Sequence, residues 1–568
     1  MYRTFAFFLT AIFITACASK NDSIDLSLVE GRGISSEKGM VVSAHPQSSR
    51  VGAAILLKGG NAIDAAVATE FALAVCYPEA GNIGGGGFML IRTADGSTEV
   101  FDYREKAPFL ASRDMYVDAT GKVIEGKSTD SHLASGVPGS VDGVINAHSK
   151  YGKLPFSDVI QPAIDLAENG FKLSSGQANS LNSNREQFIA RNVSATAFVK
   201  DSLWKEGDFL IQKDLASTLR RIRDYGRKGF YSGETARLIL NEMNRGGGLI
   251  SEKDLEYYKS VSRIPLTTDY RGYRIITASP PSGGGLILLQ LLEMVEPFPL
   301  TELGFHSASA MHLMVEAERR AFADRSEYLG DPDFIKIPVK ELISSEYLKL
   351  RMNSFNPGEA SVSIDTKPGN PDGYISEETT HYSVVDSEGN AVSTTTTLND
   401  TFGSSIVVSG AGFLLNNQMD DFSVKPGFPN MYGLVGGEAN SVAPGKRMLS
   451  SMTPSIVEKD GALFMVVGSP GGSTIPTSVF QVLVNVIDFN MKIQAAVDTG
   501  RFHHQWLPDI LSLEENAFDS MTVDKLTTLG HTIKYRSSIG RVNAVLIASD
   551  GKKWAGADKR GNNWACGY

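Results

Sequence analysis

Residues 379–400 read TTHYSVVDSEGNAVSTTTTLND, and the rest of the chain is organised around them. An alternating run ends at Val385, a turn-forming DSEGN follows at 386–390, and a second run extends to Leu398. This pattern predicts a β-hairpin. The consecutive Ser and Thr residues at 393–397 fit a strand by β-propensity alone, and they also offer hydroxyl groups to a catalytic site. The hairpin by itself does not decide between a structural and a chemical role.

Composition and charge exclude several classes of protein. The 568 residues are 42% hydrophobic, enough to bury a large core, and their formal net charge is -10 with no long cluster of Lys or Arg. An acidic balance of this kind argues against nucleic acid as the main partner. Beyond the N-terminus, no stretch reaches the roughly 18 to 20 apolar residues that a membrane-spanning helix needs. We therefore expect a globular protein with no nucleic-acid partner.

The N-terminus has the form of an export signal. Arg3 is followed by an apolar run at residues 5–16, which is too short for a membrane span. The sequence ITAC at 14–17 resembles the lipobox of bacterial lipoproteins, so Cys17 would become the lipidated first residue. ACA at 16–18 also fits ordinary signal-peptidase cleavage, and we favour the lipoprotein. The protein is then exported to the periplasm or cell envelope, and it contacts the membrane only through a lipid anchor on Cys17.

This leader sets the first boundaries of the chain. Residues 1–17 are the predicted signal peptide, and the polar residues 18–35 are the predicted tether. Two cysteines remain after the leader, so the sequence has no disulfide framework. Cys76 ends an apolar helical run and is predicted to be a buried thiol, although a bridge to Cys566 in an oxidising compartment stays open.

A run of glycines links the first helices to a strand. Residues 48–75 predict two helices that break at KGGN, and the second is apolar nearly all round, which is typical of a buried core helix. The glycines at 84–87 precede an apolar strand and predict a tight connection, or a close approach by another part of the chain. A hairpin then leads to Arg104. An Arg at a strand end forms a surface ion pair or clamps an anion, and the local sequence favours the ion pair.

The middle of the chain, residues 138–355, is predicted to be mainly helical. Helices with regular apolar spacing are expected at residues 155–169, 210–244, 285–295 and 308–328. On the last of these, His312, Glu316 and Arg320 lie four apart on one face. Their neighbours are not ligand-like, so we interpret this face as solvated or ion-paired. The sequence therefore predicts no metal site and no cofactor.

Near the C-terminus, a strand, a glycine turn and a helix follow one another. GSPGGS at 468–473 connects a buried strand to a helix that begins at about residue 475. Such a turn presents backbone N–H groups to an anion, so Gly471 and Gly472 are candidate oxyanion donors. The Gly-, Pro- and Asn-rich residues 425–446 form a segment long enough to be a lid.

An N-terminal hydroxyl nucleophile fits these pieces. A threonine with a free α-amino group can use that amine as general base, because an α-amine titrates at about 7.7–8.0. The amine does not exist until the chain is cut. The polar residues 367–378 predict an exposed loop that runs directly into the hydroxyl-rich hairpin. A cut before Thr379 would therefore create the nucleophile.

The chain contains TTHYSV at 379–384, LNNQMDDF at 415–422, LSSMTP at 449–454 and GSPGG at 468–472. In this order, these motifs resemble those of the γ-glutamyltranspeptidases, or glutathione hydrolases, and the resemblance extends from about residue 38 to residue 568. It implies an α+β fold, the αββα sandwich of N-terminal nucleophile hydrolases, with two stacked antiparallel sheets between helical layers. It also implies one cut, between Glu378 and Thr379. The large subunit (36–378) and the small subunit (379–568) would remain together as a heterodimer that forms one intertwined domain.

The resemblance also implies roles for individual residues. Thr379 would attack the γ-glutamyl amide of glutathione or a related donor, and water or the amine of an amino acid or dipeptide would release the acyl group. The other implied roles are orientation of the nucleophile by Thr397, oxyanion binding by Gly471 and Gly472, α-carboxylate binding by Arg104, Ser450 and Ser451, α-ammonium binding by Asn399, Gln418 and Asp421, and lid closure by Tyr432. Glu378 departs from the family, which often carries Gln there, and this departure bears only on the rate of cleavage.

Two other functions stay open. A glutaryl (cephalosporin) acylase shares the fold and the nucleophile but accepts a side chain without the α-amino group. Asn399, Gln418, Asp421 and the long lid argue for the γ-glutamyl donor instead. An uncleaved, inactive binding protein of the cell envelope would keep the chain in one piece.

Overall fold

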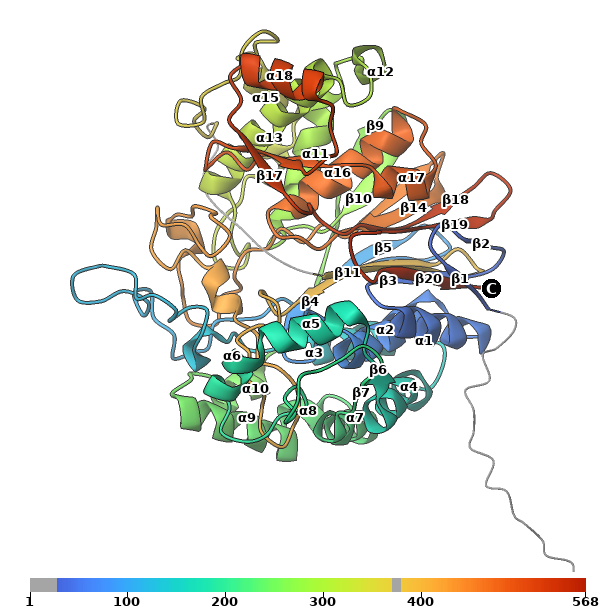
Figure 1. Ribbon diagram of the computed structural model, residues 1–568, viewed down its shortest axis with the longest axis vertical. Helices are drawn as coiled ribbons and strands as arrows, with labels where there is room; N and C mark the ends of the chain where they lie inside the picture. Colours follow the sequence, from blue (N-terminus) through green and yellow to red (C-terminus); the bar gives the residue numbers. More distant parts are fainter. Residues whose placement is uncertain (1–27, 370–379) are drawn as a thin grey trace, which may run out of the picture.

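The computed structural model describes residues 28–369 and 380–568. Two antiparallel sheets stack face to face between two layers of helices (Figure 1). Apolar side chains from both sheets, among them Val42, Leu90, Ile456 and Val545, form a continuous core between them. Alternating strands bury one set of side chains between the sheets and the other set beneath a helical layer. The predicted αββα sandwich is confirmed.

The predicted hairpin lies at the centre of the first sheet. Its two strands pair in antiparallel register, with Thr380 opposite Thr396 and His381 opposite Thr395. In spatial order the sheet contains β1 (Val29–Gly31), β20 (Trp564–Gly567), β3 (Met40–Ser43), β11 (Thr380–Val385), β12 (Ala391–Thr397), β4 (Gly86–Arg92), β5 (Thr98–Asp102) and β8 (Val261–Arg263). Strands that follow residue 379 (β20, β11 and β12) are therefore inserted between strands that precede residue 370.

The second sheet carries the strand that leads into the glycine turn. This sheet contains β2 (Ser35–Ser36), β19 (Lys553–Ala557), β18 (Asn543–Ile547), β14 (Ala462–Gly468), β13 (Ser455–Lys459), β10 (Tyr273–Thr277) and β9 (Leu266–Tyr270). Smaller sheets combine β15 (Phe502–His503), β16 (Leu511–Glu514) and β17 (Ile533–Arg536), and β6 (Phe171–Lys172) with β7 (Phe209–Leu210). The hairpin of β13 and β14 turns at Asp460 and Gly461.

One helical layer covers the outer face of the first sheet (Figure 1). Its central helix α2 is buried along its whole length and begins with a capping box between Asn61 and Asp64. The layer contains α1 (Pro46–Leu57), α2 (Ala62–Cys76), α3 (Ser140–Tyr151), α4 (Phe156–Asn169), α5 (Ser175–Ser183), α6 (Arg185–Arg191), α7 (Lys213–Tyr225), α8 (Lys228–Tyr231), α9 (Gly233–Gly246) and α10 (Glu252–Tyr257).

The other layer covers the second sheet (Figure 1). It contains α11 (Gly283–Val295), α12 (Leu300–Leu303), α13 (Ala308–Tyr328), α14 (Val339–Leu342), α15 (Ser345–Met352), α16 (Thr474–Ile487), α17 (Ile493–Asp498) and α18 (Ser520–Thr528). Short 3-10 helices occur at His132–Ala134, Gln418–Asp421 and Glu438–Asn440. Helix α16 begins directly after the glycine turn, as expected.

The prediction for residues 138–355 needs two corrections. The strands β8, β9 and β10 lie within this stretch. Strand β8 pairs with the distant β5, whereas β9 and β10 form a local hairpin that joins the distant β13 through β10. Their alternating, β-branched sequences LTTDY and YRIIT are strand-like, and the prediction of mainly helical structure missed them. The single helical stretch expected at 210–244 is three helices, because the chain breaks at Gly226, which has a positive φ, and again at Ser232.

The face of α13 that carries His312, Glu316 and Arg320 is buried, so the solvated alternative is wrong and the ion-paired one is confirmed. Glu316 accepts from Arg320 Nη1 at 2.6 Å and from Arg319 Nε at 3.0 Å. His312 Nδ1 lies 2.8 Å from His531 Nε2, and the two rings and the Glu316 carboxylate have ligand atoms within 4.8 Å of one another. Because two guanidinium groups already neutralise Glu316, a dication beside it is electrostatically unfavourable.

Cys76 and Cys566 are both free and buried, so the predicted buried thiol is confirmed and the alternative of a bridge between them is wrong. Burial raises the pKa of Cys76 to about 12.

Within residues 28–369 and 380–568, no helix has the length and apolar character needed to cross a bilayer. The predicted signal peptide with Cys17, and the predicted cut between Glu378 and Thr379, lie outside the described residues. The tether predicted at residues 18–35 is wrong from residue 28 onward, because β1 pairs with β20 and β2 pairs with β19.

Candidate active site

The hydroxyl-rich strand β12 uses some of its hydroxyls to join the two sheets. Ser393 Oγ accepts from the backbone N–H of Ser455 at 3.0 Å and donates to the carbonyl of Val467 at 3.2 Å. Thr395 Oγ1 lies 3.0 Å from His381 Nδ1. Burial lowers the pKa of His381 to about 3, so this ring is neutral at pH 7. These side chains therefore have structural roles, although the sequence also allowed the whole run to offer hydroxyl groups to a catalytic site.

Thr397 ends the strand on the same face and has a different environment. Its Oγ1 accepts from the backbone N–H of Asn399 at 2.8 Å, which leaves the Thr397 O–H free to donate. Asn399 has a left-handed backbone with φ 80°, an uncommon conformation that aims its N–H back at the strand end. Thr380, the first described residue after the predicted cut, pairs with Thr396 at this same end of the hairpin.

Asn82 fixes the end of β12, and the sequence analysis did not identify it. Its side-chain N–H groups donate to the carbonyl of Thr397 at 2.8 Å and to Thr396 Oγ1 at 3.2 Å. Its Oδ1 accepts from the N–H of Gly85 at 2.8 Å and from Ser140 Oγ at 2.7 Å. The only signal in the sequence is an Asn between Gly81 and the glycine run at 84–87, which is equally typical of an ordinary turn residue.

The glycine run at 84–87 lets these segments approach one another. A side chain at Gly85 would overlap the carbonyl of Thr397, and a side chain at Gly84 would overlap the carbonyl of Leu414. Gly86 and Gly87 already belong to β4. Both predictions for this run, a tight connection and a close approach by another segment, are confirmed.

Arg104 and Asp421 form a fully buried ion pair. The guanidinium also donates to the carbonyls of Met448 at 3.1 Å and Leu449 at 2.9 Å. The expected ion pair of Arg104 therefore exists, but it is buried and not at the surface. Burial raises the pKa of the adjacent Glu105 to about 7, even though Arg104 opposes that shift. Side by side, one cation and one anion suit a ligand that carries both charges on one carbon.

Several buried polar atoms around this pair have no hydrogen-bond partner among the described residues. Gln418 donates through Nε2 to Asp421, but its Oε1 is unpartnered. The same is true of Asn399 Oδ1 and Ser451 Oγ. Buried polar groups are almost always paired, so these atoms indicate a polar ligand. Ser450 stabilises the segment, because its N–H donates to the carbonyl of Pro281 at 2.9 Å and its Oγ accepts from Met452.

The segment predicted to be a lid lies against Asn399. The hydroxyl of Tyr432 donates to the carbonyl of Asn399 at 3.2 Å. The N–H of Met431 donates to Asp420 Oδ2 at 3.0 Å, and Asp420 Oδ1 accepts from Ser128 at 2.6 Å. Burial raises the pKa of Asp420, although both of these hydrogen bonds oppose the shift. The lid is therefore connected both to the ammonium-binding candidates and to the loop that carries Ser128.

The glycine turn after β14 has the geometry of an anion site. Gly471 and Gly472 have φ values of 129° and 66°, and within the described residues neither N–H donates a hydrogen bond. A side chain at Gly468 would overlap the ring of His381, so the turn lies against the start of β11. Free N–H groups beside the first turn of a helix stabilise a developing oxyanion.

A second loop supports this turn from behind. Gly540 packs against Gly471 so closely that a Cβ built on Gly471 would lie 2.9 Å from Gly540 Cα. The N–H of Arg541 donates to Ser469 Oγ at 3.0 Å. Arg541 also donates to the hydroxyl of Tyr77 at 2.8 Å, which joins the loop to the end of α2.

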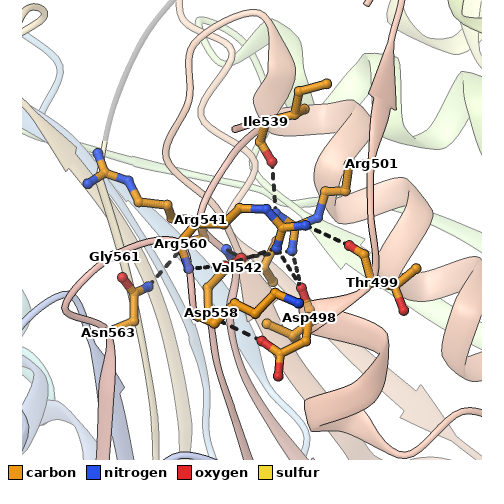
Figure 2. Close-up of polar contacts among 12 residues, drawn as sticks. Asp498, Thr499, Arg501, Ile539, Arg541, Val542, Asp558, Arg560, Gly561 and Asn563 are labelled. Carbon is orange, nitrogen blue, oxygen red and sulfur yellow. Dashed lines mark hydrogen bonds and ion pairs between the residues drawn. The ribbon is translucent and has the colours of Figure 1, made fainter. Parts of the chain in front are cut away.

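Buried charges hold both ends of that supporting loop (Figure 2). Arg501 donates to the carbonyl of Ile539 at 2.8 Å and to Asp558 Oδ2 at 2.7 Å. Asp558 also accepts from the N–H of Val542 at 2.8 Å, and Arg560 donates to its other oxygen at 3.1 Å. Partnered buried charges fix backbone position, so the glycine turn rests on a rigid base.

The sequence model described as gamma-glutamyltranspeptidase matches residues 48–568. The chain belongs to the γ-glutamyltranspeptidase family. It is 46% identical over 533 residues to the glutathione hydrolase proenzyme of Escherichia coli, covering 93% of this chain and 91% of that protein.

Solved structures of the family and of related acylases share the fold. The γ-glutamyltranspeptidase of Helicobacter pylori matches with a TM-score of 0.57 and 44% identity, covering 60% of this chain and 95% of that chain. A cephalosporin acylase from Bacillus halodurans matches with a TM-score of 0.84 and 26% identity, covering 95% of this chain and 97% of that chain. The αββα sandwich of this γ-glutamyltranspeptidase is thus that of an N-terminal nucleophile hydrolase.

Within this family member, the structure brings most of the candidate residues together. Hydrogen bonds join Arg104 and Gln418 to Asp421, and Asn399 to both Thr397 and Tyr432. Thr379 and Glu378 lie outside the described residues.

Proposed function

We propose that the protein is an autoprocessed γ-glutamyltransferase and glutathione hydrolase that uses Thr379 as its nucleophile. The observation that carries this proposal is the buried Arg104–Asp421 pair, beside which Gln418 Oε1 and Asn399 Oδ1 have no partner among the described residues. The name of the Escherichia coli relative, a glutathione hydrolase proenzyme, supports both the substrate and the maturation.

Maturation begins with an attack within the chain. Thr379 Oγ adds to the carbonyl carbon of Glu378, the peptide C–N bond breaks, and an ester replaces the amide. Breaking that bond frees the Thr379 amine, which takes the Oγ proton, and water then hydrolyses the ester to release the Thr379 hydroxyl and the Glu378 carboxylate. The cut would divide the chain into a large subunit that carries β1 and β2 and ends at Glu378, and a small subunit of residues 379–568. Because strands from both sides of the cut are interleaved in the first sheet, the subunits would stay together as a heterodimer.

Catalysis repeats the same chemistry on a γ-glutamyl donor. The free amine takes the proton of Thr379 Oγ as the oxygen attacks the γ-glutamyl amide carbon. The O–H of Thr397 orients the nucleophile, and the N–H groups of Gly471 and Gly472 bind the oxyanion. The leaving amine takes the proton from the Thr379 amine, and water or an acceptor amine then releases the acyl group as glutamate or a new γ-glutamyl compound.

Recognition depends on the two charges at the α-carbon of the donor. Arg104, with the hydroxyls of Ser450 and Ser451, binds the α-carboxylate. Asp421 binds the α-ammonium, which is a donor group, and the free oxygens of Gln418 and Asn399 accept its remaining protons. Tyr432 closes over the bound glutamyl group from the lid.

The alternative function is that of a glutaryl acylase, because a cephalosporin acylase shares the fold. It needs no partner for an ammonium group, so Asp421 and two unpartnered carbonyl oxygens would be unfavourable in its site. Initial rates with γ-glutamyl-p-nitroanilide and glutaryl-p-nitroanilide discriminate between the two activities. We expect strong preference for the γ-glutamyl compound, and a preference for the glutaryl compound would overturn the proposal.

We also propose export to the periplasm or cell envelope with a lipid on Cys17. The ITAC sequence at 14–17 supports this assignment. Replacing Cys17 with Ala is expected to move the protein from the membrane fraction to the periplasmic fraction. Retention of the Cys17→Ala protein in the membrane fraction would contradict lipid anchoring.

A further inference from the structure

Gln505 connects two parts of the candidate site that are distant in sequence. It follows β15, and its side-chain amide lies between the lid and the beginning of α16. Its Oε1 accepts from Ser473 Oγ at 2.7 Å, and its Nε2 donates to the backbone carbonyl of Tyr432 at 3.3 Å. Ser473 directly follows Gly472, so a single amide joins the oxyanion turn to the lid.

The surroundings of Gln505 allow one orientation of the amide. Its Nε2 faces two carbonyl acceptors, those of Tyr432 and Leu507, each at 3.3 Å. Its Oε1 faces Ser473 and also His503 Nε2, which lies at 3.1 Å. Reversing the amide would set its oxygen against both carbonyls, where no donor is present.

His503 reinforces this orientation. Burial lowers its pKa to about 3, so the ring is neutral and one nitrogen carries the proton. Because Gln505 Oε1 is an acceptor, the proton lies on Nε2, and Nδ1 lies 2.9 Å from Thr477 Oγ1. Thr477 belongs to α16, so the amide is held from the same helix that begins at the oxyanion turn.

These contacts form a continuous path between the oxyanion turn and Asn399. From Gly472 the path passes to Ser473, across 2.7 Å to Gln505, and across 3.3 Å to the backbone of Tyr432. The phenol of Tyr432 then reaches the carbonyl of Asn399 at 3.2 Å. The path therefore runs from the oxyanion donors to a candidate ligand of the ammonium group.

We propose that Gln505 is a positioning residue that holds the closed lid in register with the oxyanion turn. This inference rests on the proposed function for its kinetic test. With the Tyr432 backbone held by Gln505, the phenol meets Asn399 in one position, and the lid covers the glutamyl group while the oxyanion donors face its carbonyl. Without Gln505, the lid keeps its contact through Met431 and Asp420 but loses the hydrogen bond from Gln505 Nε2 to the Tyr432 carbonyl.

The test compares Gln505→Met, which removes donor and acceptor, with Gln505→Glu, which keeps the acceptor but sets a carboxylate against two carbonyls. One net hydrogen bond corresponds to about a fivefold effect on binding. We expect the KM for γ-glutamyl-p-nitroanilide to rise about fivefold in Gln505→Met and further in Gln505→Glu, with kcat changed less than about threefold. Gln161→Met and Gln161→Glu on α4 are matched controls and should leave KM unchanged.

A double-mutant cycle separates a lid role from general loosening. In a Tyr432→Phe background the phenol contact is already lost, so Gln505→Met should raise KM by less than about twofold there. A full independent effect in that background would contradict the proposal, as would an unchanged KM in both Gln505 variants. If the parent is cleaved but neither Gln505 variant is, the proposal is also contradicted, because Gln505 is proposed to position the lid and not to act in cleavage of the chain.

Amide exchange supplies a readout that does not depend on activity. Peptides from residues 425–446 should exchange faster in Gln505→Met than in the parent and in Gln161→Met. If the parent does not turn over the γ-glutamyl substrate, the proposed function fails and the exchange result still decides the role of Gln505. Identical exchange in parent and variant would overturn that role.

Discussion

The backbone N–H of Asn399 donates to Thr397 Oγ1 at 2.8 Å, so a candidate ligand of the substrate ammonium and the proposed partner of the nucleophile hold each other in place. The left-handed backbone of Asn399 makes this contact, and Asn tolerates that conformation better than most residues. The bond also fixes which way the Thr397 hydroxyl can donate.

Thr397→Val should therefore reduce kcat with γ-glutamyl-p-nitroanilide on the order of 100-fold, the effect typical of losing one preorganised donor. Thr397→Ser keeps the hydroxyl and should retain most of the activity. The measurement is steady-state kinetics on mature, purified protein. If Thr397→Val and Thr397→Ser have equal kcat, the orienting role is wrong.

Arg104→Lys should raise the KM for the γ-glutamyl donor about 10- to 100-fold, because an ammonium cannot reproduce the forked contact of a guanidinium. The charge beside Asp421 is kept, so maturation on a denaturing gel should be unaffected. Arg113→Lys, in an exposed ion pair with Glu438, is the matched control. A KM within about twofold of the parent would remove Arg104 from the binding site.

Asn82→Asp replaces the donor that holds the carbonyl of Thr397 with a second acceptor. We expect kcat to fall about tenfold and the thermal midpoint to drop by several degrees, because two buried acceptors then face a carboxylate. Asn169→Asp, at an exposed helix end, should change neither quantity. Wild-type kcat in Asn82→Asp would show that the end of β12 is held by other contacts.

Glu70→Gln should change how stability depends on pH. Burial in α2 raises the pKa of Glu70 from 4.5 to about 7. Between pH 4.5 and pH 7, the folded protein therefore keeps a proton on Glu70 that the unfolded chain has lost. Stability therefore falls as pH rises from 4.5 to 7, by on the order of 3 kcal/mol at full effect. A neutral Gln has no such loss.

Thermal midpoints of parent and Glu70→Gln should then be similar near pH 4.5 and should diverge in favour of the variant at pH 8. Parallel profiles across this range would mean that Glu70 titrates normally in the folded protein.

Local patterns predicted the parts of the site that are encoded locally. The β11–β12 hairpin, the turn at Gly471 and Gly472, and the buried helix α2 each follow from periodicity or glycine content within one short segment. The position of Arg104 at a strand end predicted an ion pair. Its burial could not be predicted, because its partner Asp421 lies more than 300 residues away in the sequence.

The supporting residues could not be predicted for the same reason. Asn82 and Gln505 act through partners that only the assembled sheets bring near, and in the sequence each is an unremarkable polar residue in a loop. Strand β8 was missed because its pairing partner β5 lies far from it along the chain, whereas β9 and β10 form a local hairpin whose strand-like sequences were overlooked. Short strands of this kind acquire their stability from the sheet they join.

The central claim is that a cut before Thr379 creates the nucleophile. A denaturing gel of the purified protein, followed by N-terminal sequencing of the smaller band, tests it most directly. The account predicts two bands, a smaller one that begins with Thr379-Thr380-His381, and a single uncut band in Thr379→Ala. A single full-length band in the parent, or a smaller band with any other first residue, would contradict it.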